Sequence, residues 1–208
     1  IQGNLEILRG GLTPDLRQEL QTELDLIEDQ TQRINLIVGK LLNFTRPGEL
    51  SDATSLVDVA SVVQDTLVLV APDLRKHGIE AAITHSPAPT IRIVETELQQ
   101  VLINLFVNAA QAMAPGGTVD VRTSAVVRDG VNGAQIVVRD TGPGIAAEDL
   151  PQVFDPFFTT KPAEGSGLGL SISQTLIARA GGLITAESVL GEGTTFFIWC
   201  PEAEPSVS

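Results

Sequence analysis

Hydrophobic side chains recur at steps of three and four residues through the first quarter of the chain, and this spacing predicts paired helices. Over residues 20–41 the steps alternate between four and three, the heptad repeat of helices that pack lengthwise against one another. Thr13-Pro14 is typical of a helix start, and Arg46-Pro47-Gly48 is typical of a helix end. The heptad positions are Leu20, Leu24, Ile27, Ile34, Val38 and Leu41, with Thr31 in the one gap.

A shorter apolar series precedes this helix, at Ile1, Leu5, Leu8 and Leu12. At 1.5 Å per residue the second helix of this hairpin would run about 45 Å and the first only about 15 Å. An unmatched apolar seam would face water, so we expect the first helix to continue before Ile1. We also expect the antiparallel hairpin to pair with a second copy, as a four-helix homodimer. The alternative is a solitary hairpin packed on the rest of the protein.

After a loop rich in Ser, Asp and Thr the period changes, and helices and strands follow in groups rather than in strict alternation. This grouping predicts an α+β sandwich in which helices cover one face of a mixed sheet. We expect a hairpin domain over 1–47, a linker over 48–55, an α/β sandwich domain over 56–201 and a tail over 202–208. The expected helices are 59–75, 95–113 and 168–180, and the expected strands are 80–84, 90–93, 119–127, 134–140, 183–188 and 194–199. Asp129-Gly130 and Asn132-Gly133 predict the turn of a β-hairpin between strands 119–127 and 134–140.

The charge and residue composition of the chain limit the classes of partner and the compartment that we expect. Among 208 residues, 13 Lys and Arg stand against 26 Asp and Glu, a net charge of −13, which disfavours nucleic acid and anionic lipid as partners. No apolar run reaches the roughly 18–20 residues of a membrane span, and nothing at the start reads as a signal peptide. Cys200 is the single cysteine, so we expect a reducing, cytoplasmic compartment and no direct membrane contact from this segment. His77 and His85 lack partners in a nucleophile or metal pattern, so we expect structural roles for both.

Three carboxamides share one face of the predicted helix 95–113. Gln100, Asn104 and Asn108 are spaced four residues apart in an otherwise apolar stretch. Asn is a poor helix former and is costly to bury unpaired. Two interpretations remain open from this helix alone: a polar seam satisfied inside the core, or a face that meets a polar ligand.

Glycine-bearing turns surround this helix in the sequence. Asp140-Thr141-Gly142-Pro143-Gly144 puts a carboxylate at a strand end beside bare backbone, which suits an exocyclic amine on a flat ring. Gly165-Ser166-Gly167-Leu168-Gly169 opens a helix, where free N–H groups can bind phosphate. A third such turn is Gly191-Glu192-Gly193-Thr194. Asn108 offers the neutral oxygen that Mg²⁺ accepts beside waters and phosphates, and Lys161 adds positive charge.

Residues 142–165 show little regular pattern, and a loop of that length within a compact domain is typically a lid or disordered. Phe154, Phe157 and Phe158 belong to it. They anchor the lid to the core, or form a hydrophobic latch that docks on a neighbouring helix, and both roles are compatible.

The ordered set NLFVNAAQAM, DTGPGI, FDPFFTTK, GSGLGL and GEGTTF, within residues 104–196, resembles the N, G1, F, G2 and G3 boxes of sensor histidine kinases. These kinases belong to an ATPase superfamily shared with gyrase, mismatch-repair ATPases and heat-shock chaperones. The hairpin looks like the family's dimerisation and phosphotransfer helices, and FFTTK is similar to the lid of the nitrogen-regulation type. The resemblance extends over nearly the whole chain.

The resemblance implies a role for each matched position. Asn108 would bind Mg²⁺, Asn104 would line the phosphates, and Asp140 would accept a hydrogen bond from the adenine amine. Gly142 and Gly144 would shape the adenine pocket, with Thr194 as its back wall. The phosphate-side lid hinge would comprise Gly165, Ser166, Gly167, Leu168 and Gly169, and Lys161 would reach the phosphates when the lid closes.

The implied activity is transfer of the γ-phosphoryl group of ATP·Mg²⁺ to a histidine, and then to an aspartate of a response regulator. The family's acceptor histidine is absent from the matching position, so we expect it before Ile1, where a membrane-anchoring region would also lie. The alternative is a dimeric ATP-binding scaffold that docks a receiver domain without phosphorylating itself. A hydrolytic ATPase would need a glutamate base where Asn104 stands, and Glu95 and Glu97 are too far back. A serine kinase of the anti-sigma type is disfavoured by the heptad hairpin and the complete FFTTK sequence.

Overall fold

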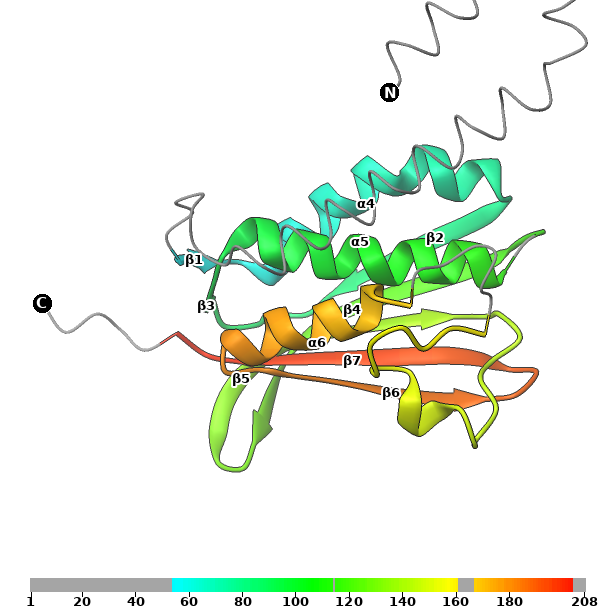
Figure 1. Cartoon of the computed structure of the whole chain (residues 1–208). Helices are drawn as coiled ribbons and strands as arrows, with labels where there is room; N and C mark the ends of the chain where they lie inside the picture. Colours follow the sequence, from blue (N-terminus) through cyan, green and yellow to red (C-terminus); the bar gives the residue numbers. More distant parts are fainter. Residues whose placement is uncertain (1–53, 114, 161–166, 204–208) are drawn as a thin grey trace, which may run out of the picture. The chain divides into compact units, whose positions relative to one another are not determined.

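The computed structural model describes residues 54–113, 115–160 and 167–203 (Figure 1). The predicted hairpin over 1–47 lies outside the described residues, as do the linker up to residue 53 and the tail from residue 204. The same holds for Lys161, Gly165 and Ser166 of the expected site. The helices are α4 Val59–Lys76, α5 Glu95–Ala112 and α6 Gly169–Arg179, with a short 3-10 turn, η1 Leu150–Gln152. The strands are β1 Ser55–Val57, β2 Ile79–His85, β3 Ile91–Ile93, β4 Gly117–Arg128, β5 Val131–Asp140, β6 Leu183–Val189 and β7 Gly193–Pro201.

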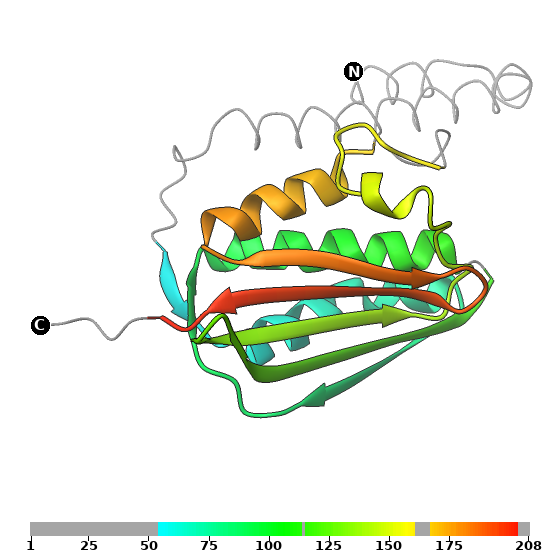
Figure 2. The same cartoon turned by 90° about the horizontal axis from the view of Figure 1, so that it is seen from below.

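The larger sheet is mixed, as the sequence predicts. Its strand order is β2-β4-β5-β7-β6, in which β2 and β4 are parallel and the other neighbouring pairs are antiparallel. β1 and β3 form a separate antiparallel pair. Figures 1 and 2 show α4, α5 and α6 on one face of the five-stranded sheet, which confirms the expected α+β layering of this domain.

The helices cover the sheet because each presents an apolar face to it. In α4 the buried side chains follow the helical period, and Asp58 caps its start by accepting a hydrogen bond from the Ala60 N–H at 3.1 Å. α5 lies between α4 and α6 and is buried on most sides. The side chains Leu98, Val101, Leu102, Leu105 and Phe106 of α5 are at most 1% exposed. This central helix therefore holds the domain core and carries the carboxamide face.

The β4–β5 hairpin turns at one of the two predicted places. Asp129 and Gly130 both have positive φ, at 50° and 80°, which is the geometry of a two-residue type I′ turn. Asn132 and Gly133, predicted as part of the turn, lie within β5 and pair with Val127 and Val126 of β4. Gly133 is required there for packing, because a Cβ atom would clash with the indole ring of Trp199. The Trp199 indole N–H donates to the Val126 carbonyl across the same strands at 3.1 Å.

The first strand, β1, was not predicted from the sequence. Ser55, assigned to the linker from its composition, starts β1 and pairs with Ile93 of β3. β1 has three residues, of which only Val57 is buried, so it shows no alternating pattern by which it could be predicted. Within the described ranges no helix combines the length and the apolar character that crossing a membrane requires.

Candidate functional site

α5 joins the glycine-bearing turns that the sequence analysis singled out. Gly169, at the start of α6, lies against Asn104: a Cβ atom on this glycine would be 3.7 Å from the Asn104 Cγ. One on Gly142 would be 3.4 Å from the Ala112 Cβ, near the end of α5. Eight residues of helix separate Asn104 from Ala112, which is about 12 Å. Asn108 lies midway between them, one helical turn from each.

The Asn104 amide, 6% exposed, is engaged by its neighbours. Its Nδ2 donates to the Gly169 carbonyl at 3.1 Å and to the Ser173 Oγ at 3.2 Å. Its Oδ1 accepts from the Gln100 Nε2 at 3.1 Å. The Ser173 hydroxyl also donates to the Gly169 carbonyl, at 2.9 Å. For Asn104 and Gln100 the structure therefore favours the polar-seam interpretation, and the seam holds the first turn of α6 against α5.

Asn108 differs from Asn104. Its side chain is half-buried and makes no hydrogen bond to any other described residue. An amide that is not engaged within the protein keeps its oxygen available to a ligand. The two asparagines of one helix face therefore differ: Asn104 ties two helices together, and Asn108 is open.

The start of α6 offers free main-chain donors beside Asn104, one helical turn away from Asn108. Leu168 is the N-cap residue, and no side chain caps the helix. The first N–H groups of an uncapped helix have no partner within the helix, and the helix dipole favours an anion there. Gly167 precedes the cap, and its carbonyl accepts the Phe157 N–H at 3.0 Å, so the backbone at Phe157 is bonded next to the start of α6. This end of the site suits phosphate.

Asp140 ends β5 and is 5% exposed. Its Oδ1 accepts the N–H groups of Gly142 at 2.9 Å and Thr194 at 3.2 Å. No described residue donates to its second oxygen, Oδ2. Burial raises the pKa of this carboxyl above the value usual for an aspartate, and the two N–H donors oppose the rise. Asp140 is therefore a fixed, shielded acceptor with one oxygen left for a donor such as an amine.

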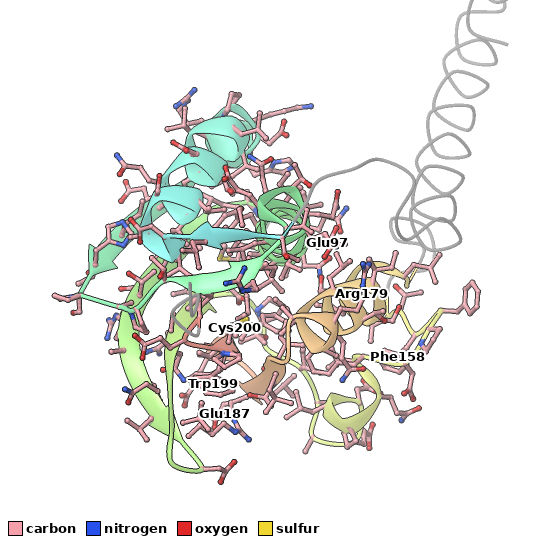
Figure 3. All side chains as sticks on the ribbon, turned by 90° about the vertical axis from the view of Figure 1, so that its left-hand side faces the viewer. Glu97, Phe158, Arg179, Glu187, Trp199 and Cys200 are labelled. Carbon is pink, nitrogen blue, oxygen red and sulfur yellow. The ribbon has the colours of Figure 1, made fainter. Side chains whose placement is uncertain are left out.

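The lid begins as a series of tight turns anchored by one phenylalanine. Phe154 packs edge-on against Phe196 of β7, with ring centroids 6.5 Å apart and an interplanar angle of 82°. Phe158 is half-buried, and Figure 3 shows it at the side of the domain that carries α6. Phe157 is 72% exposed and has a positive φ of 68°. Phe154 therefore matches the anchoring interpretation, whereas the exposed Phe157 side chain is available to a partner surface.

The described side chains can supply only some of the ligands that Mg²⁺ requires. In the described ranges no three His, Cys, Asp or Glu side chains gather at one point, so a carboxylate cage is not available there. The open Asn108 oxygen beside an uncapped helix start suits an ion that takes most of its ligands from phosphate and water.

Other reactive side chains lie away from this site or are engaged. The His77 Nδ1 contacts the Asp73 carbonyl at 2.8 Å, and the His85 Nδ1 contacts the Thr123 Oγ1 at 2.9 Å, which agrees with structural roles. Burial raises the pKa of the Cys200 thiol to about 12, so the thiol stays protonated.

Several residues that build the site gave no usable sequence signal. Ser173 and Ser188 make buried or half-buried contacts to residues far away in the chain. Arg179, in the last turn of α6, pairs with Glu97 in the first turn of α5 at 2.9 Å (Figure 3). Serine and arginine are common on helix and strand surfaces, so only the Gln100–Asn104–Asn108 spacing pointed to the seam in advance.

Fold and site together define an α+β ATP-binding domain, built on one central helix and the glycine-bearing turns at its two ends. A family profile described as "Histidine kinase-, DNA gyrase B-, and HSP90-like ATPase" matches residues 93–204. The chain belongs to this family, and its ATP-binding domain is that of a sensor histidine kinase catalytic core.

Individual relatives of the chain include histidine kinases. The sensor histidine kinase ZraS of Escherichia coli K12 is 36% identical over 193 residues, which cover 92% of this chain and 38% of ZraS. The structure of full-length ShkA in complex with AMPPNP matches with a TM-score of 0.78 and 29% identity, over 97% of this chain and 42% of ShkA. The histidine kinase ThkA, solved in complex with the response regulator TrrA, shares the fold at 22% identity and a TM-score of 0.71, over 97% of this chain and 56% of ThkA. The chain thus spans less than half the length of the ZraS relative.

Proposed function

We propose that this chain is the core of an ATP-dependent protein-histidine kinase. The observation that carries the proposal is the arrangement along α5: a shielded Asp140 acceptor near one end, the uncapped start of α6 beside Asn104, and the open Asn108 amide between them. A nucleotide has the same order of groups, with a base that donates from its amine at one end and phosphates at the other.

The adenine end is assigned to the turn after β5 and the turn before β7. The Asp140 Oδ2 accepts the hydrogen bond of the adenine amine. Gly142 and Gly144 keep bare backbone against the ring, and Thr194, whose N–H binds the other Asp140 oxygen, forms the back wall. Asp140 and Thr194 are each only 5% exposed, so both are largely shielded from solvent.

The phosphate end is assigned to the start of α6. The main-chain N–H groups after Leu168 bind phosphate oxygens, with Asn104 beside them and Gly165, Ser166, Gly167 and Gly169 as the lid hinge. Lys161 reaches the phosphates from the lid. Asn108 holds Mg²⁺, which supplies neutralisation of the phosphate charge when bound, a need made greater by the protein's own charge of −13.

The transfer step is an in-line displacement at the γ-phosphorus. An imidazole nitrogen forms the new P–N bond, the bond to the ADP oxygen breaks, and the protein contributes orientation rather than covalent chemistry. His77 and His85 are assigned no acceptor role, because both contact their own domain. We assign the acceptor to a dimerisation helix that precedes Ile1 in a longer protein, with the linker at residues 46–55 as the hinge.

The partners follow from the same proposal. A second copy pairs through the hairpin over residues 1–47, and the phosphoryl group passes to an aspartate of a response-regulator receiver domain. The solved complex of the histidine kinase ThkA with the response regulator TrrA supports this choice of partner.

The test uses γ-labelled ATP with Mg²⁺ on a version of the protein lengthened upstream to include the acceptor. We expect label that acid removes, as for a phosphohistidine. We expect Asn108→Ala to lose this label and to weaken Mg²⁺-dependent ATP binding at least about tenfold, the equivalent of about 1.4 kcal/mol. Asn132→Ala, which removes an exposed asparagine from β5, is the matched control and keeps both activities.

Two outcomes contradict the proposal. Full labelling of the Asn108→Ala protein would remove the metal assignment. ATP binding without any labelling of the lengthened protein would favour the dimeric scaffold that docks a receiver domain without phosphorylating itself.

A further inference from the structure

Two turns meet at the adenine end of the site and are joined main chain to main chain. The Gly191 N–H, in the turn between β6 and β7, donates to the Pro143 carbonyl, in the turn after β5, at 2.7 Å. The approach is so close that a Cβ atom on Gly144 would overlap the Val189 carbonyl, and one on Gly193 would overlap the Asp140 carbonyl. Both glycines also have positive φ, at 73° and 113°. The position of one turn therefore fixes the position of the other.

One side chain connects both turns. Ser188, near the end of β6, accepts the Ile145 N–H on its Oγ at 2.8 Å and donates to the Gly193 carbonyl at 2.8 Å. The same Oγ lies 3.0 Å from the Thr194 Oγ1. A serine hydroxyl has one hydrogen and two lone pairs. The Ser188 hydrogen is donated to the Gly193 carbonyl, so the Thr194 hydroxyl donates to the Ser188 Oγ. All three bonding positions of the Ser188 hydroxyl are therefore used.

These bonds reach the base-binding carboxylate through one further contact. The Thr194 N–H donates to the Asp140 Oδ1, so the residue that Ser188 holds by its hydroxyl also holds Asp140 by its main chain. On the other side, Ile145 directly follows Gly144, which closes the turn that begins at Asp140. Ser188 is thus bonded to both segments that set the orientation of Asp140, without touching Asp140 itself.

We propose that Ser188 is a positioning residue for adenine recognition, which fixes the turn after β5 on the turn before β7 and thereby holds the free oxygen of Asp140 in place. The inference rests on the proposed function, because it assumes that adenine binds at Asp140. It assigns Ser188 no contact with the nucleotide. Removal of the hydroxyl leaves the Ile145 N–H and the Gly193 carbonyl without their partner, so the two turns keep the Gly191–Pro143 bond but lose the side-chain link that orients them.

The test compares binding of adenosine, ADP and ATP to the full chain by calorimetry. We expect Ser188→Ala to weaken all three by a similar factor, about tenfold, because the three ligands share only the adenosine part. Ser188→Thr keeps a hydroxyl and is expected to bind within about twofold of the unchanged protein. Thr175→Ala is the matched control: its hydroxyl also bonds a main-chain carbonyl, that of Ser171 at 3.0 Å, but on the exposed face of α6.

Ser188→Cys keeps the size of the side chain and removes the strong donor and acceptor, so it replaces Ser188→Ala if the alanine protein does not fold. Wild-type affinity in the folded Ala or Cys protein overturns the proposal. A loss of affinity for ATP alone also overturns the proposal, because it would indicate an effect on phosphate binding and not on adenine binding.

Amide hydrogen exchange without any ligand separates this inference from the proposed function. The Ile145 amide is expected to exchange at least about tenfold faster in Ser188→Ala than in the unchanged protein, since its acceptor is gone. If the unchanged protein binds no adenine ligand, the proposed function fails, and the exchange of Ile145 still decides whether Ser188 holds the turn. Unchanged exchange at Ile145 overturns the positioning role.

Discussion

Asp140 is the residue on which the proposed recognition of adenine depends. A buried carboxylate is costly unless it is paired or hydrogen-bonded, and here two main-chain N–H groups bind one of its oxygens. The other oxygen has no partner among the described residues. The protein thus places an acceptor in a shielded position, and the raised pKa of the carboxyl is the energetic sign of that placement.

The raised pKa gives a testable pH dependence. The folded protein binds more protons than the unfolded chain between the ordinary aspartate pKa and the raised one. The contribution of Asp140 to the free energy of unfolding is therefore present below that window and is lost as pH rises through it. Adenosine affinity changes in the opposite sense, because the ionised carboxylate is the better acceptor of the amine, and we expect it to fall as pH is lowered through the raised pKa.

Asp140→Asn is the control for this prediction, because it removes the titrating group and leaves all others. Its adenosine affinity, measured by calorimetry across the same pH range, is expected to lack this step and to discriminate less between ATP and GTP. The same pH step in both proteins would show that another group titrates.

Single residues proposed to face a ligand were easier to recognise in the sequence than the residues that hold them in position. Asp140 and Asn108 stand next to glycines or on a helix face with an unusual composition, and both lie in the site. Ser188 was missed because a serine in a strand has no distinguishing neighbours. Its partners Ile145 and Gly193 come from segments whose proximity only the fold creates.

Among the elements, the α5–α6 pair shows how a polar contact can organise an apolar interface. The seam of Gln100, Asn104 and Ser173 lies at the start of α6, and the Arg179–Glu97 ion pair lies at its end. The ion pair is half exposed and contributes little to stability, whereas the buried seam fixes the rotation of α6 about its axis. The N–H groups that we propose bind phosphate therefore take their direction from an asparagine on a different helix.

Ser173→Ala tests the seam. Ser173 is fully buried, and its loss leaves one Asn104 N–H without an acceptor, so we expect a decrease of about 1–3 kcal/mol in the free energy of unfolding. Thr175→Ala removes an exposed hydroxyl of the same helix that also bonds the carbonyl four residues earlier. We expect this control to change the free energy of unfolding by less than about 0.5 kcal/mol. Urea unfolding of both proteins provides the comparison, and equal effects would argue against the seam.

The long periodic elements of the fold were predictable, and the exceptions have local causes. The helices α4, α5 and α6 fall within a few residues of their predicted ranges because their apolar periods extend over several turns. The second glycine turn of the hairpin was misassigned, since Asn132-Gly133 has a turn composition but its glycine serves the contact with Trp199. The parallel pairing of β2 with β4 depends on the crossover helix and not on either strand, so the sequence predicted only a mixed sheet.

At the scale of the whole domain, the only tryptophan of the chain lies in the sheet, where its fluorescence can report on folding. Trp199 lies on β7, next to the buried Cys200 and on the face opposite to the helices (Figure 3). Its indole is half-buried over Gly133 and bonded to Val126, so its fluorescence reports on the pairing of β4, β5 and β7. The adenine end is built from the ends of β5 and β7, so ligand binding and sheet stability are linked.

We expect ADP to raise the midpoint of thermal unfolding as followed by Trp199 fluorescence. At one hundred times the dissociation constant the linkage relation gives about 2.7 kcal/mol, or roughly 5–10 °C for a protein of this size. GDP at the same concentration is the control and is expected to give a much smaller rise. Equal rises with both nucleotides would contradict base recognition through Asp140.

The place of β7 in the sheet also has a consequence for synthesis. β7 is the last of the described strands, yet it lies between β5 and β6, which have no pairing with each other. The ribosome releases the chain from its N-terminal side, so β6 emerges before β7, the strand with which it pairs. Thr194, which completes the surroundings of Asp140, arrives later still. A nascent chain halted before residue 193 would therefore lack the adenine pocket that we propose, and would acquire it only when the final strand inserts.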